Sequence, residues 1–161
     1  MVLVELVAVL GNLAGSLFVL SLLYGHGRDL GGWSWDAALV VLGLYTLLDG
    51  FTSCLLQPNL SKIVGHVQNG TLDFVLLKPI DSQFWLSTRS VSPWGLPGMV
   101  AGLALIGWAL VQNGTVLSAG GLALAVALLV AGGLILYSLW FLLAGLSIWF
   151  VKVWNATEVL R

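Results

Sequence analysis

Residues that could carry out bond-breaking or metal chemistry are few, and their spacing matches no catalytic pattern. The sequence has neither the H-E-x-x-H pair of metalloproteases nor the G-x-S-x-G turn of serine hydrolases. Its single cysteine, Cys54, excludes an intrachain disulfide and a cysteine-based metal site. We therefore predict that this chain is not an enzyme and carries no catalytic residue, metal or cofactor.

Nucleotide-binding motifs are missing as well. No stretch fits G-x-x-x-x-G-K-[ST], the loop whose backbone N–H groups cradle phosphates beside a lysine. The glycine-rich residues 25–32 have the wrong spacing and contain no lysine. If ATP drives the work of this chain, a separate chain must bind it.

Asp49 is the one carboxylate deep within a long apolar stretch, and Glu5 lies near the start of another. A charged group at membrane depth is costly, so Asp49 is a functional candidate if its stretch crosses a membrane. The alternative places Asp49 towards one end of its helix, where it faces water or neighbouring helices. Both interpretations stay open for this intramembrane polar candidate.

The amino-acid composition indicates whether water or lipid surrounds the protein. Hydrophobic residues make up 59% of the 161 residues, charged residues only 8%, and the mean hydropathy is +1.02. A soluble domain carries roughly 25% charged residues, because water must wet its surface. The sequence therefore predicts a membrane protein in a lipid bilayer. Its net charge of -1 offers no basic field for nucleic acid.

Long apolar runs predict an all-α, polytopic transmembrane bundle of about four spanning helices in a single domain, residues 1–161. The fourth run would be about 50 Å long as a helix, so it must tilt, project beyond the bilayer, or bend at Gly132-Gly133. The expected spans are residues 2–23, 37–56, 94–111 and 119–151.

Basic residues indicate the orientation of the spans. Five of the six lie between the second and third spans or after the fourth, and only Arg28 lies on the other side. Because cytoplasmic loops carry the excess of Lys and Arg, we place the loop 57–91 and both chain ends in the cytoplasm. His26 and His66 then lie on opposite sides and cannot share a metal. We expect a plasma (inner) membrane location, in a bacterium.

Two pairs of glycines are spaced for close helix contact, Gly11 with Gly15 and Gly98 with Gly102. Small residues let helix backbones approach each other in a membrane. We expect these pairs to pack within the bundle or against a second subunit.

The loop 57–91 is unusually apolar for a segment outside the membrane. Leu60, Ile63, Val64 and Val67 have the spacing of one helix face, and Asn69-Gly70 is a typical helix stop. A further apolar stretch ends at Pro79, after which we expect Ser82 to cap a short helix. Such a loop either rests on the membrane surface as an amphipathic segment or docks a cytoplasmic partner.

Within this loop, Gly70-Thr71-Leu72-Asp73-Phe74 and Leu76-Leu77-Lys78-Pro79-Ile80 resemble a signature of type-2 ATP-binding-cassette permeases, the ABC-2 family related to drug-resistance exporters. Residues 22–25 and 137–141 fit the same pattern. The resemblance implies an exporter permease that pairs with a second copy, as homodimer or heterodimer, and with a separate ABC ATPase subunit that binds ATP. It also implies that the loop contains a helix coupled to that ATPase. The residues in or beside this coupling region would be Gly70, Thr71, Leu72, Asp73, Phe74, Leu76, Leu77, Lys78 and Pro79.

The chain departs from the family pattern at both ends. It lacks a basic amphipathic stretch before the first span and the last two of six spans, so we expect a truncated copy of a longer protein. Two other functions stay open: a membrane scaffold or assembly protein that does not transport, and an ion-coupled carrier that uses Asp49.

Overall fold

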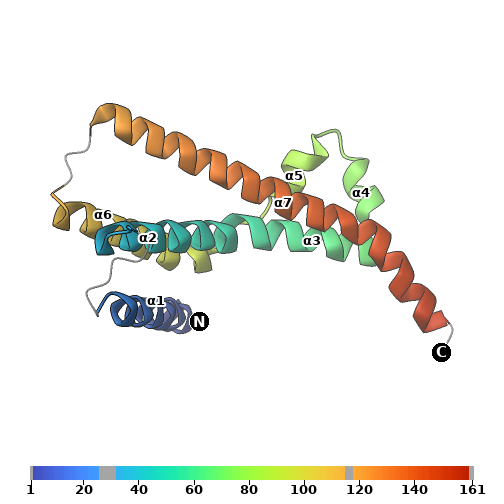
Figure 1. The fold of residues 1–161 in the computed structure, drawn as a ribbon. Coiled ribbons are helices and arrows are strands. Elements are labelled where there is room, and N and C mark those ends of the chain that lie inside the picture. Colours follow the sequence, from blue (N-terminus) through green and yellow to red (C-terminus); the bar gives the residue numbers. More distant parts are fainter. Residues whose placement is uncertain (1, 26–31, 115–117, 160–161) are drawn as a thin grey trace. The chain divides into compact units, whose positions relative to one another are not determined.

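The computed structural model describes the fold of residues 2–25, 32–114 and 118–159 (Figure 1). Every regular element in this part of the chain is a helix, which confirms the all-α prediction. Within these described residues, four helices are long and apolar enough to cross a membrane, so the protein is a multi-pass membrane protein. These candidate spans are Leu6–Tyr24, Trp35–Gln68, Pro93–Gln112 and Ala119–Leu146.

The chain packs as two units. One comprises Met1–Phe51 with Pro93–Leu122, and the other Thr52–Ser92 with Ala123–Arg161. The first unit holds α1 (Val2–Tyr24), α2 (Trp35–Phe51), the 3-10 turn η2 (Pro93–Gly95) and α6 (Leu96–Gln112). The second holds the π-helical turn η1 (Thr52–Leu56), α3 (Gln57–Gln68), α4 (Leu72–Leu76), α5 (Ser82–Thr88) and most of α7 (Ala119–Val159).

In the first unit, α2 and α6 approach each other through glycines. A Cβ atom added at Gly102 would lie 2.6 Å from the Leu47 nitrogen, and one at Gly50 would lie 2.6 Å from the Met99 nitrogen. Glycine is required because any side chain would collide with the facing backbone. The close contact expected at Gly98 and Gly102 is therefore confirmed. At Gly11 and Gly15 an added Cβ would meet nothing within 4 Å, so their role stays a prediction.

Besides the glycine contacts, α2 and α6 bury a small apolar core of Leu39, Leu105 and Ala109. Leu13 and Leu17 of α1 pack against it. Much of the remaining apolar surface of α1 is exposed, as expected for a helix whose other faces meet lipid.

The second candidate span is longer than the sequence suggested. Helical structure runs on from Trp35 to Gln68, whereas we expected the span to end at residue 56 and a separate amphipathic helix to follow within the loop. Pro58 did not end the helix, because it lies at the start of α3, where a missing N–H is tolerated. The turn of π-helix before it, Thr52–Leu56, adjusts the backbone.

Helix α7 is continuous, and its 41 residues include Gly132-Gly133 without interruption. The bend that we considered at these glycines does not break the helix. Tilting in the bilayer, projecting beyond it, or bending without a break remain the ways to fit such a length.

Candidate functional site

The segment after Pro58 forms three short helices, α3, α4 and α5, joined by tight turns (Figure 1). Helix α3 ends as predicted at Asn69-Gly70: its last helical residue is Gln68, and Gly70 has φ = +65°. Two hydrogen bonds stabilise the turn that follows. The Thr71 N–H donates to the His66 carbonyl at 2.9 Å, and the Thr71 hydroxyl forms a hydrogen bond with His66 Nδ1 at 2.8 Å. The direction of α4 is thus fixed by local hydrogen bonds.

The cap of α5 differs from the one we expected. Asp81, and not Ser82, is the N-cap, and its carboxylate accepts a hydrogen bond from the Phe84 N–H at 2.7 Å. Asp and Ser are comparable N-caps, so their types alone could not choose between adjacent positions. Ser82 is the first residue of the helix.

A buried asparagine connects α3 to the chain that follows α5. Asn59 is 1% exposed, and its amide donates to the Ser90 carbonyl at 2.6 Å and accepts from the Ser90 N–H at 2.7 Å. Nearby, the Ser92 N–H donates to the Cys54 carbonyl at 2.8 Å. That carbonyl lies four residues before Pro58, which has no N–H to offer it. The polar groups freed at the π-helical turn are therefore satisfied by the segment that leads into the third span.

The expected coupling residues lie together on α4 and its two flanking turns. Val75 points inward and is 5% exposed, whereas Phe74 is 71% and Leu77 80% exposed. Leu72 is half-buried, and Asp73 and Pro79 lie at the surface. Leu76, Ile80 and Phe84 of the same segment are exposed as well. A cluster of large apolar side chains on the outside of a hydrogen-bonded frame is typical of a contact surface.

Lys78, another expected coupling residue, covers an aromatic ring that sequence reasoning did not connect with it. Its Nζ lies 4.4 Å from the centre of the Trp85 ring, and the guanidinium carbon of Arg89 lies 5.6 Å from the same ring. The indole Nε1 is buried and finds no acceptor among the described residues. The sequence signal was a basic-aromatic spacing across the turn at Pro79, which becomes visible only once α5 is placed.

Tyr137 anchors α5 to α7 within the second unit. Its hydroxyl lies 2.8 Å from the Ser87 hydroxyl and accepts a hydrogen bond from Gln83 Nε2 at 3.1 Å. Residues 137–141 contributed to the family resemblance, but no sequence pattern pairs Tyr137 with residues 50 positions away.

Asp49 lies on an exposed face of α2. The buried face of this helix carries Leu39, Gly43, Leu47 and Gly50, which turn towards α6. No group of three His, Cys, Asp or Glu residues that could hold a metal occurs in the part of the chain that the structure describes. Cys54 is buried as a free thiol, and His66 bonds Thr71.

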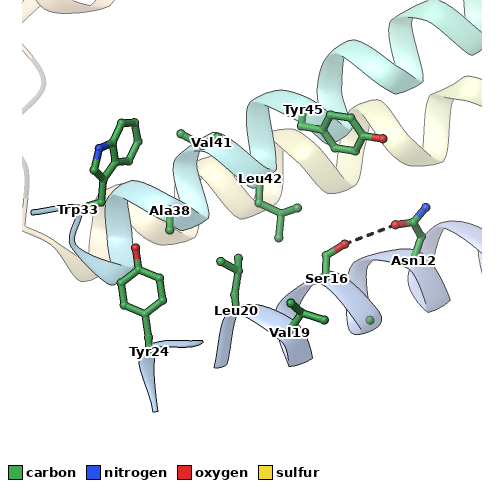
Figure 2. Close-up of a pocket in the computed structure, with 11 residues that line it drawn as sticks. Asn12, Ser16, Val19, Leu20, Tyr24, Trp33, Ala38, Val41, Leu42 and Tyr45 are labelled. Atoms are coloured by element: carbon green, nitrogen blue, oxygen red, sulfur yellow. Dashed lines mark hydrogen bonds between the residues drawn. The ribbon is translucent and has the colours of Figure 1, made fainter. Parts of the chain in front are cut away.

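An open groove of about 860 Å³ runs between α1 and α2 in the first unit (Figure 2). Tyr24 and Trp33 lie towards one end of it, and Asn12, Ser16 and Tyr45 towards the other. Ser16 donates to the Asn12 amide oxygen over 3.5 Å, the dashed line in Figure 2. None of the lining residues is charged, so the groove suits an uncharged, mainly apolar group.

Long apolar helices and the segment of short helices before the third candidate span define a helical, multi-pass membrane protein. A family model described as "ABC-2 family transporter protein" matches residues 10–161. The chain belongs to this family, and it is a permease component of an ABC transporter. No curated protein and no solved structure shows significant similarity to it.

Proposed function

We propose that this permease works in an ATP-driven exporter, with ATP hydrolysed on a separate ABC ATPase chain and a second permease copy completing the pathway. The family supports the ATPase partnership. The charge asymmetry of the loops supports a cytoplasmic position for residues 57–91 and for both chain ends, in a bacterial inner membrane.

The observation that carries the proposal is the exposed apolar surface of α4. Phe74 and Leu77 are among the most exposed large apolar residues of the second unit, although neighbouring Val75 is buried. Apolar surface removed from water contributes roughly 25 cal/mol per Å², so burying two such side chains in a groove of the ATPase would stabilise the complex. The cap at Asp81 and the turn at His66 hold this surface in place before any partner arrives.

The segment that carries α4 is connected through the chain to two candidate spans, one at each of its ends. Helix α3 forms the last part of the second candidate span, and residues 90–92 lead into the third. Asn59 and Ser90 join the two ends by two hydrogen bonds. A displacement of α4 by nucleotide-driven closure of the ATPases would thus reach both spans together. Alternating access then needs two helix packings of similar energy.

The test is co-purification of an ATPase with the full-length gene product in mild detergent. Phe74→Asp and Leu77→Asp replace exposed apolar side chains with charges, and they should abolish co-purification without changing the permease's elution volume or melting temperature. Ser61→Asp is the matched control, since it adds the same charge at an exposed position of α3 and should retain the ATPase.

Two results would count against the proposal. An ATPase that co-purifies equally with all variants would remove the coupling role from α4. If no ATPase co-purifies with the wild-type protein in any detergent, a scaffold or an ion-coupled carrier becomes the better account of this chain.

A further inference from the structure

All the basic side chains that the structure describes lie in one segment. They are Lys62 on α3, Lys78 after α4, and Arg89 at the end of α5, and all three are exposed. Lys78 and Arg89 converge on the Trp85 ring, at 4.4 Å and 5.6 Å from its centre. Lys62 Nζ donates to the hydroxyl of Ser90, the residue next to Arg89. Three positive charges therefore surround one short stretch of chain.

Within the described residues, these charges have no acidic partner in an ion pair. The carboxylate nearest to Lys78 in sequence, Asp81, is engaged at the start of α5, where it accepts the Phe84 N–H. Asp73 is exposed on α4. Residues 57–91 hold three cations against two carboxylates, Asp73 and Asp81, so the segment carries an excess of positive charge.

The position of this field along the chain is that of a membrane surface. Arg89 and Ser90 shortly precede Pro93, where the third candidate span begins. The Asn59–Ser90 hydrogen bonds hold α3 against Ser90. Lys62 lies one turn further along α3 and is therefore near the start of the third candidate span as well. Tryptophan is enriched at membrane–water interfaces, and Trp85 lies half-buried beside Lys78 and Arg89, as a residue at that level would.

We propose that Lys62, Lys78 and Arg89, arranged around Trp85 and Ser90, bind the phosphate of an anionic membrane phospholipid. Arginine matches phosphate oxygens through two parallel N–H donors, and the lysines add charge on either side. Clusters of Lys and Arg immediately beside a span are attracted to anionic lipids in this way. The proposal does not depend on the exporter function, because the same site would hold a lipid in a scaffold or a carrier.

The bound lipid would give the loop a second attachment. Phe74 and Leu77 are exposed on or directly after α4. The cations lie elsewhere in the segment: Lys62 on α3, Lys78 in the turn between α4 and α5, and Arg89 directly after α5. A headgroup held there would fix the loop against the bilayer and leave the apolar surface free for a protein partner.

The experiment uses the purified full-length chain in detergent and native mass spectrometry with added phosphatidylglycerol or phosphatidylcholine. We expect phosphatidylglycerol to remain bound and phosphatidylcholine to dissociate. The double variant Lys78→Gln/Arg89→Gln should lower the apparent affinity for phosphatidylglycerol about tenfold, with phosphatidylcholine unchanged. Lys152→Gln removes a charge elsewhere in the chain and should bind like the wild type.

A charge-retaining variant guards against a purely structural effect. Lys78→Arg/Arg89→Lys keeps both cations and should bind phosphatidylglycerol within about threefold of the wild type. If this variant loses binding as fully as the glutamine pair, or if Lys152→Gln has the same effect as that pair, the proposal is wrong. It is also wrong if inorganic phosphate alone displaces the lipid at equal concentration, since the site would then be one for a free anion.

Discussion

The amide of Asn59 and the backbone of Ser90 form a closed pair of hydrogen bonds across 31 residues of chain. Asn59 also donates to the Leu55 carbonyl at 2.7 Å, so three bonds converge on one buried side chain. A side-chain amide has the same donor and acceptor as a peptide group, and here it pairs with Ser90 as a neighbouring strand would. Asn59 therefore ties the chain entering the third span to α3 through a buried side chain.

Replacement of Asn59 by Leu should therefore destabilise the protein. The side chains are similar in size, but the N–H and carbonyl of Ser90 would lose their partners, at roughly 1–3 kcal/mol for each buried group left unpaired. We expect the melting temperature in detergent to fall by several degrees. Circular dichroism at the helical band measures it.

Ser61→Ala is the control on the same helix. It removes a local hydrogen bond from Ser61 to the Gln57 carbonyl at an exposed position, and such changes stay within about 0.5 kcal/mol. Equal melting temperatures for Asn59→Leu and the wild type would show that the Asn59–Ser90 pair contributes little.

The sequence predicted the features that depend on neighbours along the chain. Apolar runs gave helices near all four candidate spans, and Asn69-Gly70 gave the end of α3, because both signals are local. The continuation of the helix beyond residue 56 was not predicted, because it depends on a distant donor, the Ser92 N–H, which satisfies the Cys54 carbonyl. The contacts of Lys78 with Trp85 and of Tyr137 with Ser87 were likewise invisible, since nothing local marks them.

The glycine contacts of the first unit were also predicted only in part from the sequence. Gly98 and Gly102 were found by their spacing of four, but their partners on α2, Gly43 and Gly50, are seven residues apart and were missed. A spacing of seven also places residues on one helix face, so this signal was present. Which glycine faces which could come only from the packed helices.

Gly102→Ala should loosen the pair of helices α2 and α6. Its Cβ would lie 2.6 Å from the Leu47 nitrogen and 2.7 Å from the Gly43 carbonyl oxygen, and backbone atoms cannot turn aside as a side chain can. Overpacking of this kind costs about 1–3 kcal/mol. Thermal unfolding in detergent should show a lower melting temperature.

Gly107→Ala is the matched control on α6, because an added Cβ there meets nothing within 4 Å. Alanine is the better helix former by about 0.5–1 kcal/mol, so this variant should be as stable as the wild type or more so. If both variants melt at the wild-type temperature, the close approach of α2 and α6 is not needed for stability.

Pro58→Ala should separate stability from transport. Alanine supplies an N–H that competes with Ser92 for the Cys54 carbonyl, so the helix across Thr52–Leu56 gains a regular hydrogen bond. We expect an unchanged or higher melting temperature, faster amide exchange at Ser92 and several-fold slower transport. Hydrogen exchange detected by mass spectrometry and efflux from cells measure the two effects. Unchanged exchange at Ser92 would mean that Pro58 does not direct this contact.

Asp49→Asn distinguishes the proposed exporter from an ion-coupled carrier. Asp49 lies outside the buried face of α2, so the substitution removes a charge without disturbing the contact with α6. In an ATP-driven exporter this charge takes no part in energy coupling, and we expect efflux within about twofold of the wild type, still dependent on ATP and independent of an imposed proton gradient. Uptake of substrate into inside-out vesicles, energised either by ATP or by a pH difference, measures both. Loss of efflux in the variant, together with transport driven by the pH difference in the wild type, would assign the coupling ion to Asp49 and favour the carrier, because a carboxylate inside a span is the group such a carrier needs.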